Sequence, residues 1–156
     1  MVTSKKLLRE YYPKEIGIYI HIPFCRKKCE YCDFLSFPID GNIPDDYINA
    51  LIKELGTEPY PFEIKSIYLG GGTPSLLSIK QIDKIIYYEN KFFISVSPEI
   101  TIEVNPDDIT ESWVKEIKNM GINRISIGVQ SFNDKDLKYL GRRHNAEKAK
   151  KSCEII

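Results

Sequence analysis

Three cysteines, Cys25, Cys29 and Cys32, lie close together at C-x3-C-x2-C spacing. Thiolates at this spacing can hold three corners of a cubane iron–sulfur cluster and leave the fourth iron open for another ligand. A structural zinc site would need a fourth N or S ligand, and the other candidates are His21 and the distant Cys153. The spacing alone favours a cluster, and it leaves zinc and unligated thiols open as alternatives.

A glycine-rich turn, Gly70-Gly71-Gly72-Thr73-Pro74-Ser75, directly follows an apolar segment that ends at Leu69. Three glycines allow backbone amides to approach an amino or carboxylate group of a ligand closely. The turn lacks the GK[ST] ending of a phosphate-binding loop. A tight strand-to-helix turn without a ligand is the alternative interpretation.

A carboxylate, Glu103, interrupts the apolar segment Thr101-Ile-Glu-Val-Asn-Pro106. Burying a carboxylate alone is costly, so the residue must be paired or must bind a polar group. A pair of ribose hydroxyls or an ammonium group would be a suitable ligand. A salt bridge to Arg124 or Arg142 is the alternative.

Two further polar groups follow the next apolar segment. Gln130 comes just after it, and Arg142 and Arg143 lie in the string Leu140-Gly-Arg-Arg-His-Asn145. An arginine fork binds a carboxylate through two hydrogen bonds, whereas a solvated helix end is the plainer explanation of the basic pair.

Three other residues have plainer interpretations. We interpret His144 as a surface or helix-cap residue, Cys153 as a thiol in the core, and Trp113 as a residue that packs a helix on a sheet.

Apolar strands and amphipathic helices alternate along the chain. The patterns predict strands over residues 16–22, 66–69, 99–104 and 124–129, and helices over 45–55, 78–88, 110–120, 134–140 and from 146 onward. Ser78 and Gln81 are placed as a capping box, and Gly121 is placed as a helix stop. This alternation predicts an α/β fold with parallel strands.

The chemically active residues sit where predicted strands end: Cys25, Gly71, Glu103 and Gln130. Ligands bind at the carboxyl edge of parallel sheets, so we expect one site there.

Bulk composition excludes several classes of function. The 22 basic and 22 acidic side chains balance, which argues against nucleic acid as a partner. No apolar run is long enough to span a membrane, and four cysteines without an apolar leader favour the cytoplasm.

The last predicted helix would end with its apolar face uncovered, and four strands would leave an open edge. We therefore expect a chain truncated at its C-terminal side. Residues 1–15 would form an N-terminal extension, and 16–156 an incomplete core of about four βα units.

These motifs together resemble the radical S-adenosylmethionine (SAM) superfamily. Within it, they resemble the oxygen-independent coproporphyrinogen III oxidases and the related heme chaperones of the HemW type. The resemblance rests on four strings, in the expected order: Y-I-H-I-P-F-C-x3-C-x-Y-C-D-F, G-G-G-T-P-S, E-x-N-P and G-V-Q-S-F…L-G-R-x-H. It implies the N-terminal part of a (β/α) partial barrel.

The resemblance also implies the cofactors and their ligands. Cys25, Cys29 and Cys32 would hold a [4Fe–4S] cluster, whose open iron would chelate SAM. The residues expected to contact cluster and SAM are Tyr19, Tyr31, Gly71, Gly72, Thr73, Glu103, Gln130 and Arg142.

One departure selects the branch. The oxidases are expected to carry the pattern C-x3-C-x2-C-x-C, and this chain has Phe34 where the last cysteine of that pattern would stand. The resemblance thus implies a heme chaperone that binds SAM and heme or porphyrin and hands heme to an acceptor protein. Oxidative decarboxylation of coproporphyrinogen III is the first alternative, and an inactive truncated fragment is the second.

Overall fold

A computed structural model of the protein describes residues 15–57, 63–92 and 94–156. The expected N-terminal extension, 1–15, lies outside the described residues except for Glu15, which already belongs to the first strand. Within the described ranges, none of the helices combines the length and the apolar character needed to cross a membrane.

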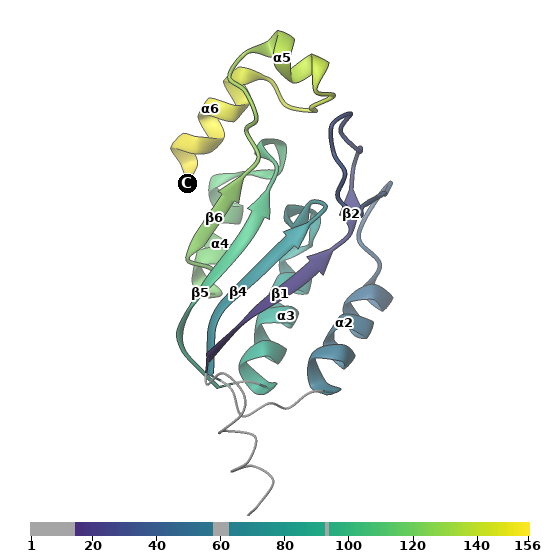
Figure 1. Ribbon diagram of the computed structural model, residues 1–156. Helices are drawn as coiled ribbons and strands as arrows, with labels where there is room; N and C mark the ends of the chain where they lie inside the picture. Colours follow the sequence, from purple (N-terminus) through teal and green to yellow (C-terminus); the bar gives the residue numbers. More distant parts are fainter. Residues whose placement is uncertain (1–14, 58–62, 93) are drawn as a thin grey trace, which may run out of the picture.

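Four parallel strands form the central sheet, in the order β1-β4-β5-β6. The prediction of an α/β fold with parallel strands is confirmed. Figure 1 shows the four strands running side by side, with their carboxyl ends toward the same end of the molecule. The strands are β1 (Glu15–Ile22), β4 (Glu63–Gly71), β5 (Ile94–Val104) and β6 (Arg124–Ile127).

Each of the first three strands leads toward a helix that covers the sheet. The helices are α2 (Asp45–Thr57), α3 (Ile79–Phe92) and α4 (Glu111–Asn119). In Figure 1, α3 and α4 lie behind the sheet, and α2 lies beside α3. Parallel strands need such crossover connections, because a short hairpin can join only antiparallel neighbours.

Helix starts follow the sequence signals. The Gln81 amide donates to the Ser78 hydroxyl at 3.3 Å, and the Ser78 amide donates to the Gln81 side chain at 3.0 Å, so the predicted capping box is confirmed. Thr110 caps α4 by accepting from the Trp113 amide at 3.2 Å. Trp113 itself packs against the core, as predicted.

The core lies between the sheet and helices α2, α3 and α4, and isoleucine dominates it. Fully burying such a side chain contributes about 2 kcal/mol, and β-branched residues also suit the pleated surface of a strand. The residues with 0 % exposure in this core include Ile22, Ile64, Ile67, Leu69, Ile82, Ile85, Ile102 and Ile109.

Two short helices, α5 (Asp134–Tyr139) and α6 (Ala146–Ile155), follow β6. Helix α6 buries Ala149 and Ser152 and packs on the short helix η2 (Pro106–Asp108). Cys153 is exposed, so its interpretation as a core thiol is wrong. One residue advances the helix by about 100°, and Cys153 therefore points away from the face that Ser152 buries.

Of the three apolar residues that end the chain, Ile155 packs against the core while Cys153 and Ile156 are exposed, so the predicted uncovered face is confirmed only in part. Four small elements of the described chain escaped the sequence analysis: the short helices η1 (Pro74–Leu76) and η2, and two strands. Strands β2 (Phe24–Cys25) and β3 (Phe37–Pro38) pair in parallel and close the base of the cysteine-bearing loop.

Candidate functional site

A cavity of about 280 Å³ lies where the cysteine loop meets the carboxyl ends of β4, β5 and β6. This is the edge at which the sequence predicts a site. Ten of the eleven predicted site residues line it: Cys25, Cys29, Tyr31, Cys32, Gly71, Gly72, Thr73, Glu103, Gln130 and Arg142.

The base of the cysteine loop is held by two backbone hydrogen bonds. The Phe37 amide donates to the Pro23 carbonyl at 2.7 Å, and the Ile39 amide donates to the Cys25 carbonyl at 2.8 Å. All three thiols are free; Cys25 is buried, while Cys29 and Cys32 are half-buried. A loop with a fixed base and three thiols on one cavity suits a ligand larger than one ion.

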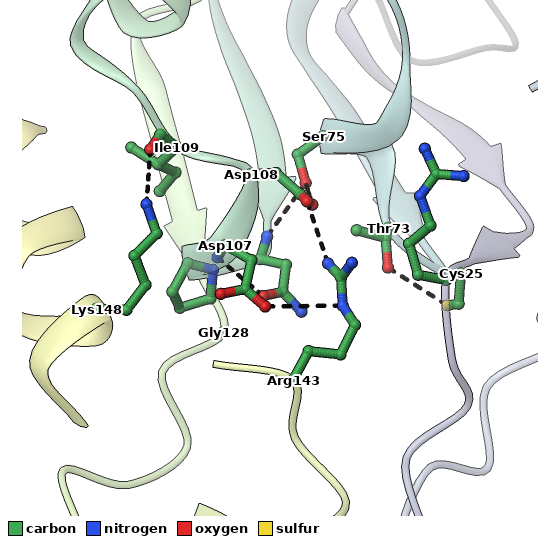
Figure 2. A network of polar contacts seen from close by, with 12 residues as sticks. Cys25, Thr73, Ser75, Asp107, Asp108, Ile109, Gly128, Arg143 and Lys148 are labelled. Carbon is green, nitrogen blue, oxygen red and sulfur yellow. Dashed lines mark hydrogen bonds and ion pairs between the residues drawn. The ribbon is translucent and has the colours of Figure 1, made fainter. Parts of the chain in front are cut away.

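Two of the three sulfur atoms already receive hydrogen bonds from other predicted site residues. The Thr73 hydroxyl donates to Cys25 Sγ at 3.4 Å, and Arg142 Nη1 donates to Cys29 Sγ at 3.3 Å. Figure 2 shows the contact between Thr73 and Cys25. Donors aimed at sulfur stabilise thiolate, which is the ligating form of cysteine.

The donor set does not form a site for one ion. Among the residues that the structure describes, no group of three or more His, Cys, Asp and Glu side chains is arranged to hold a single metal ion. Zinc draws four ligands tightly onto one centre, whereas a cubane cluster distributes thiolates over separate irons. The cavity offers three cysteine thiols, one fewer than a structural zinc site needs and the number that a cluster with one open iron uses.

The glycine turn is shaped by close backbone contacts. Gly71 has φ +113°, and a Cβ on Gly72 would lie 2.7 Å from the Phe24 carbonyl oxygen. The Gly72 and Thr73 amides donate to the Ile22 and Phe24 carbonyls at 2.9 and 2.8 Å. Only glycine permits this close approach. The two hydrogen bonds attach the end of β4 to the start of the cysteine loop.

Glu103 is held by the glycine turn and by β4. Its carboxylate accepts from the Gly71 amide at 3.0 Å and from the Tyr68 hydroxyl at 2.7 Å. Arg124 instead bonds Glu99 at 2.8 Å, and Arg142 bonds Cys29 and Gly128. The alternative in which either arginine neutralises Glu103 is thus wrong.

The environment of Glu103 extends to two tyrosines. Burial and the hydrogen bond to Glu103 raise the pKa of Tyr68, so its hydroxyl remains a donor at neutral pH. Tyr19 stacks on Tyr68 with ring centroids 6.0 Å apart. Tyr19 does not line the cavity, however, and its predicted contact with cluster or SAM stays a prediction.

Tyr31, in the cysteine loop, lies beside Arg142. Burial raises the pKa of Tyr31, and the charge of Arg142 opposes that rise. The side chain is still 45 % exposed and lines the cavity, so it offers an aromatic face next to the cysteines.

Gln130 and Arg142 converge above Gly128. A Cβ on Gly128 would lie 3.4 Å from Gln130 Nε2 and 3.4 Å from Arg142 Nη2, and Arg142 Nη2 donates to the Gly128 carbonyl at 2.7 Å. Gln130 has φ +67°, a left-handed conformation that costs a non-glycine residue about 1 kcal/mol. Such strain is typical of functional sites.

His144 differs from its sequence interpretation. It is 3 % exposed, and its Nε2 contacts the Val129 carbonyl at 3.0 Å, so the interpretation as a surface residue is wrong. Burial lowers the pKa of His144, which keeps the ring neutral at pH 7. The contact with Val129 joins the two ends of the segment that carries Gln130 and Arg142.

The sequence analysis missed several residues of the wall. Ser126, Val104 and Asn105 line the cavity, and so do Lys27 and Lys28 of the cysteine loop. The alternation of β6 could have revealed Ser126, because its exposed positions are 124 and 126. Phe34, which marked the branch in the sequence, also lines the cavity and is 67 % exposed.

Comparisons with known proteins agree with this geometry. The profile described as the radical SAM superfamily matches residues 19–156. The heme chaperone HemW of Escherichia coli is 39 % identical over 145 residues, which are 90 % of this chain and 38 % of that protein. The heme chaperone HemW of Haemophilus influenzae is 41 % identical and is covered to 39 %.

A solved structure is similar over nearly the whole chain. It is described as "Coproporphyrinogen III oxidase (HemN) from Escherichia coli is a Radical SAM enzyme", with a TM-score of 0.86 and 27 % identity. The similarity covers 97 % of this chain and 36 % of that one. The chain thus spans well under half the length of the relatives it matches.

Proposed function

Because the chain belongs to the radical SAM superfamily, we propose that its cavity binds a [4Fe–4S] cluster and SAM in the service of heme metabolism. The observation that carries the proposal is the convergence of the three cysteines with Thr73, Glu103 and other predicted site residues on one cavity. Cluster and SAM are the cofactors of the family; the residue assignments are ours.

The cysteines would hold the cluster, and two neighbours would support them. Thr73 and Arg142 donate to Cys25 and Cys29, so each would stabilise a ligating thiolate. Held there, the cluster would supply one-electron reducing chemistry toward the sulfonium of SAM. The protein's own part is to bind and orient.

The remaining residues would recognise the ends of SAM. The Gly71 and Gly72 amides already donate within the protein, so their carbonyls would receive the ammonium group of SAM, and the Arg142 guanidinium would attract its carboxylate. Glu103 is already oriented by Tyr68 and Gly71, so its oxygens would meet ribose hydroxyls without rearrangement. Gln130 would complete that contact.

For the whole protein, we propose a heme chaperone rather than an oxidase. Two observations support this choice. Two HemW heme chaperones are 39 % and 41 % identical to the chain. Phe34 stands on the cavity wall, at the position where we expect the oxidases to carry a further cysteine. Heme, and an acceptor protein for it, would then be partners. Coproporphyrinogen III oxidation remains the second candidate because the HemN structure is so similar.

One experiment tests the cofactor site. The chain is reconstituted anaerobically with iron and sulfide, and the dissociation constant of SAM is measured by equilibrium dialysis. Arg142→Gln should weaken SAM binding roughly tenfold or more, because a charge-assisted pair is lost. Arg124→Gln is the matched control, since that guanidinium bonds the exposed Glu99. Failure of the reconstituted chain to bind SAM contradicts the proposal and favours the inactive fragment.

A second experiment separates the chaperone from the oxidase. The reconstituted protein is titrated with hemin and, separately, incubated with coproporphyrinogen III, SAM and a reductant. The chaperone predicts hemin binding without protoporphyrinogen formation. Turnover of the porphyrinogen would refute the chaperone and establish the second candidate.

A further inference from the structure

One carboxylate connects two of the loops that form the cavity. Asp108 accepts from the Ser75 hydroxyl at 2.7 Å and from Arg143 Nη2 at 3.1 Å. Figure 2 shows Asp108 between these two side chains, with Arg143 also reaching Asp107. The Asp108 side chain is 14 % exposed and that of Arg143 is 27 % exposed, so this ion pair is screened less than a surface pair.

The Ser75 side of the connection is rigid. Ser75 is 7 % exposed, and its hydroxyl also accepts from the Asn105 amide at 3.2 Å. The hydroxyl therefore both donates and accepts within the protein. Two residues earlier, Thr73 donates to Cys25 Sγ, so a shift of Ser75 would also move the Thr73 hydroxyl relative to that sulfur.

At the other end of this connection, Arg143 directly follows Arg142 in the chain. While the guanidinium of Arg143 is held by Asp108 and lies 3.9 Å from Asp107, that of Arg142 reaches Cys29 Sγ and the Gly128 carbonyl. Consecutive side chains of one loop are thus fixed in two directions. Fixing the Arg143 side chain therefore restricts the positions that the Arg142 side chain can take.

We propose that Arg143 is a positioning residue: its ion pair with Asp108, braced by Ser75, sets the place of the Arg142 guanidinium relative to Thr73 across the cavity. The role deepens the proposed SAM site and rests on it. Asp108 does not line the cavity whereas Arg143 does, so Asp108→Asn tests the connection without removing a side chain from the cavity wall.

A purely structural role for this ion pair predicts a different outcome, and the chain offers a control for it. The same turn is attached to α6 by two other hydrogen bonds, from Ser152 Oγ to the Pro106 carbonyl at 2.8 Å and from Lys148 Nζ to the Ile109 carbonyl at 3.0 Å. Figure 2 shows the second of these. Neither involves Arg143.

The first test compares SAM affinity in reconstituted variants of equal iron content. Asp108→Asn and Arg143→Gln should each weaken SAM binding roughly tenfold, because Arg142 is no longer held in the binding geometry. The double variant should lose no more than the worse single variant, since both changes break one connection. Arg143→Lys should recover affinity to within about threefold of the unaltered chain, because it retains a charge opposite Asp108.

Ser152→Ala removes a buried hydrogen bond from the same turn. It should lower the melting temperature at least as much as Asp108→Asn does and leave SAM affinity unchanged. If Ser152→Ala weakens SAM binding equally, the effect is general loosening of the turn, and the positioning role is refuted.

A second readout needs no cofactor. In the cluster-free chain with ¹⁵N-labelled arginine, the guanidinium signals of Arg142 are assigned by their loss in Arg142→Lys. Asp108→Asn should shift or broaden these signals, and Ser152→Ala should leave them in place. Unchanged Arg142 signals in Asp108→Asn would overturn the inference even if SAM affinity falls.

These outcomes separate the inference from the proposed function. If the unaltered reconstituted chain does not bind SAM, the proposed function fails, while the arginine signals still test the connection. If the unaltered chain binds SAM and both Asp108→Asn and Arg143→Gln bind it equally well, only the positioning role fails.

Discussion

At the scale of single residues, the decisive contacts are donors that reach sulfur and carboxylate. Arg142 and Thr73 each contact a different cysteine, and Glu103 is oriented by a tyrosine and a glycine amide. These contacts join motifs that lie far apart in the sequence. They explain why separate strings of polar residues act as one candidate site.

Cysteine substitution tests the cluster ligands directly. Cys29→Ala should abolish the visible iron–sulfur absorption of the reconstituted chain, because a cluster without one of its three thiolates is not retained. Iron and sulfide content are measured alongside the spectrum. Cys153→Ser is the matched control, since that thiol is exposed and lies outside the cavity. An unaltered spectrum in Cys29→Ala would show that this thiolate is not a ligand.

At the scale of elements, the starts of α2 and α3 are joined by one buried side chain. Gln81 is 7 % exposed and belongs to the capping box of α3. Its Nε2 also donates to the Ile43 carbonyl at 2.9 Å and to Asp45 Oδ1 at 2.7 Å. The two helices that cover the β1–β4 side of the sheet are thereby fixed to each other.

Gln81→Ala should therefore lower the free energy of unfolding by about 2 kcal/mol, because buried groups lose their partners. Urea unfolding followed by circular dichroism measures it. Lys84→Met is the control: Lys84 donates to Asn49 at 2.7 Å between the same helices, but in an exposed position, and should change stability by less than about 0.5 kcal/mol. Equal losses in both variants would contradict the assignment.

At the scale of the whole molecule, one buried carboxyl makes stability depend on pH. Glu89 on α3 is 0 % exposed, and among the residues that the structure describes neither of its carboxylate oxygens has a hydrogen-bond partner. Burial raises the pKa of Glu89 from 4.5 to about 7. The folded chain therefore keeps the proton over a range in which the unfolded chain has lost it.

The sign follows from this difference. Stability is full below pH 4.5, declines as the pH rises to about 7, and stays lower above that value. The loss amounts to about 3 kcal/mol at 1.36 kcal/mol per pH unit. Glu89→Gln should remove this decline and stabilise the chain at pH 8, as measured by urea unfolding from pH 5 to 8. A variant that follows the pH dependence of the unaltered chain would disprove it.

The sequence foresaw most of the architecture. All four strands of the sheet and all five α-helices from α2 to α6 were predicted, because apolar periodicity and capping residues act over short distances. The sequence did not foresee β2 and β3, two residues each, since a pair that short leaves no periodic pattern. The larger barrel, the domain limits and the truncation stay predictions.

By itself, the sequence determined the chemistry that is available: three thiols at cluster spacing, a glycine turn, Glu103 near the end of a predicted strand, Gln130 after a strand and Arg142 after a short helix. These are local facts of residue type and order. Parallel pairing brings successive strand ends to one edge, so a common site could also be predicted.

Only the tertiary structure decided which groups pair within that site. Within the described part of the fold, Glu103 accepts from Tyr68 and Gly71 and does not pair with an arginine. His144 is buried and Cys153 is exposed. Asp108 joins Ser75 to Arg143. Such choices depend on loop paths and on the rotation of each helix about its axis. Distant segments fix both, and no local pattern encodes them.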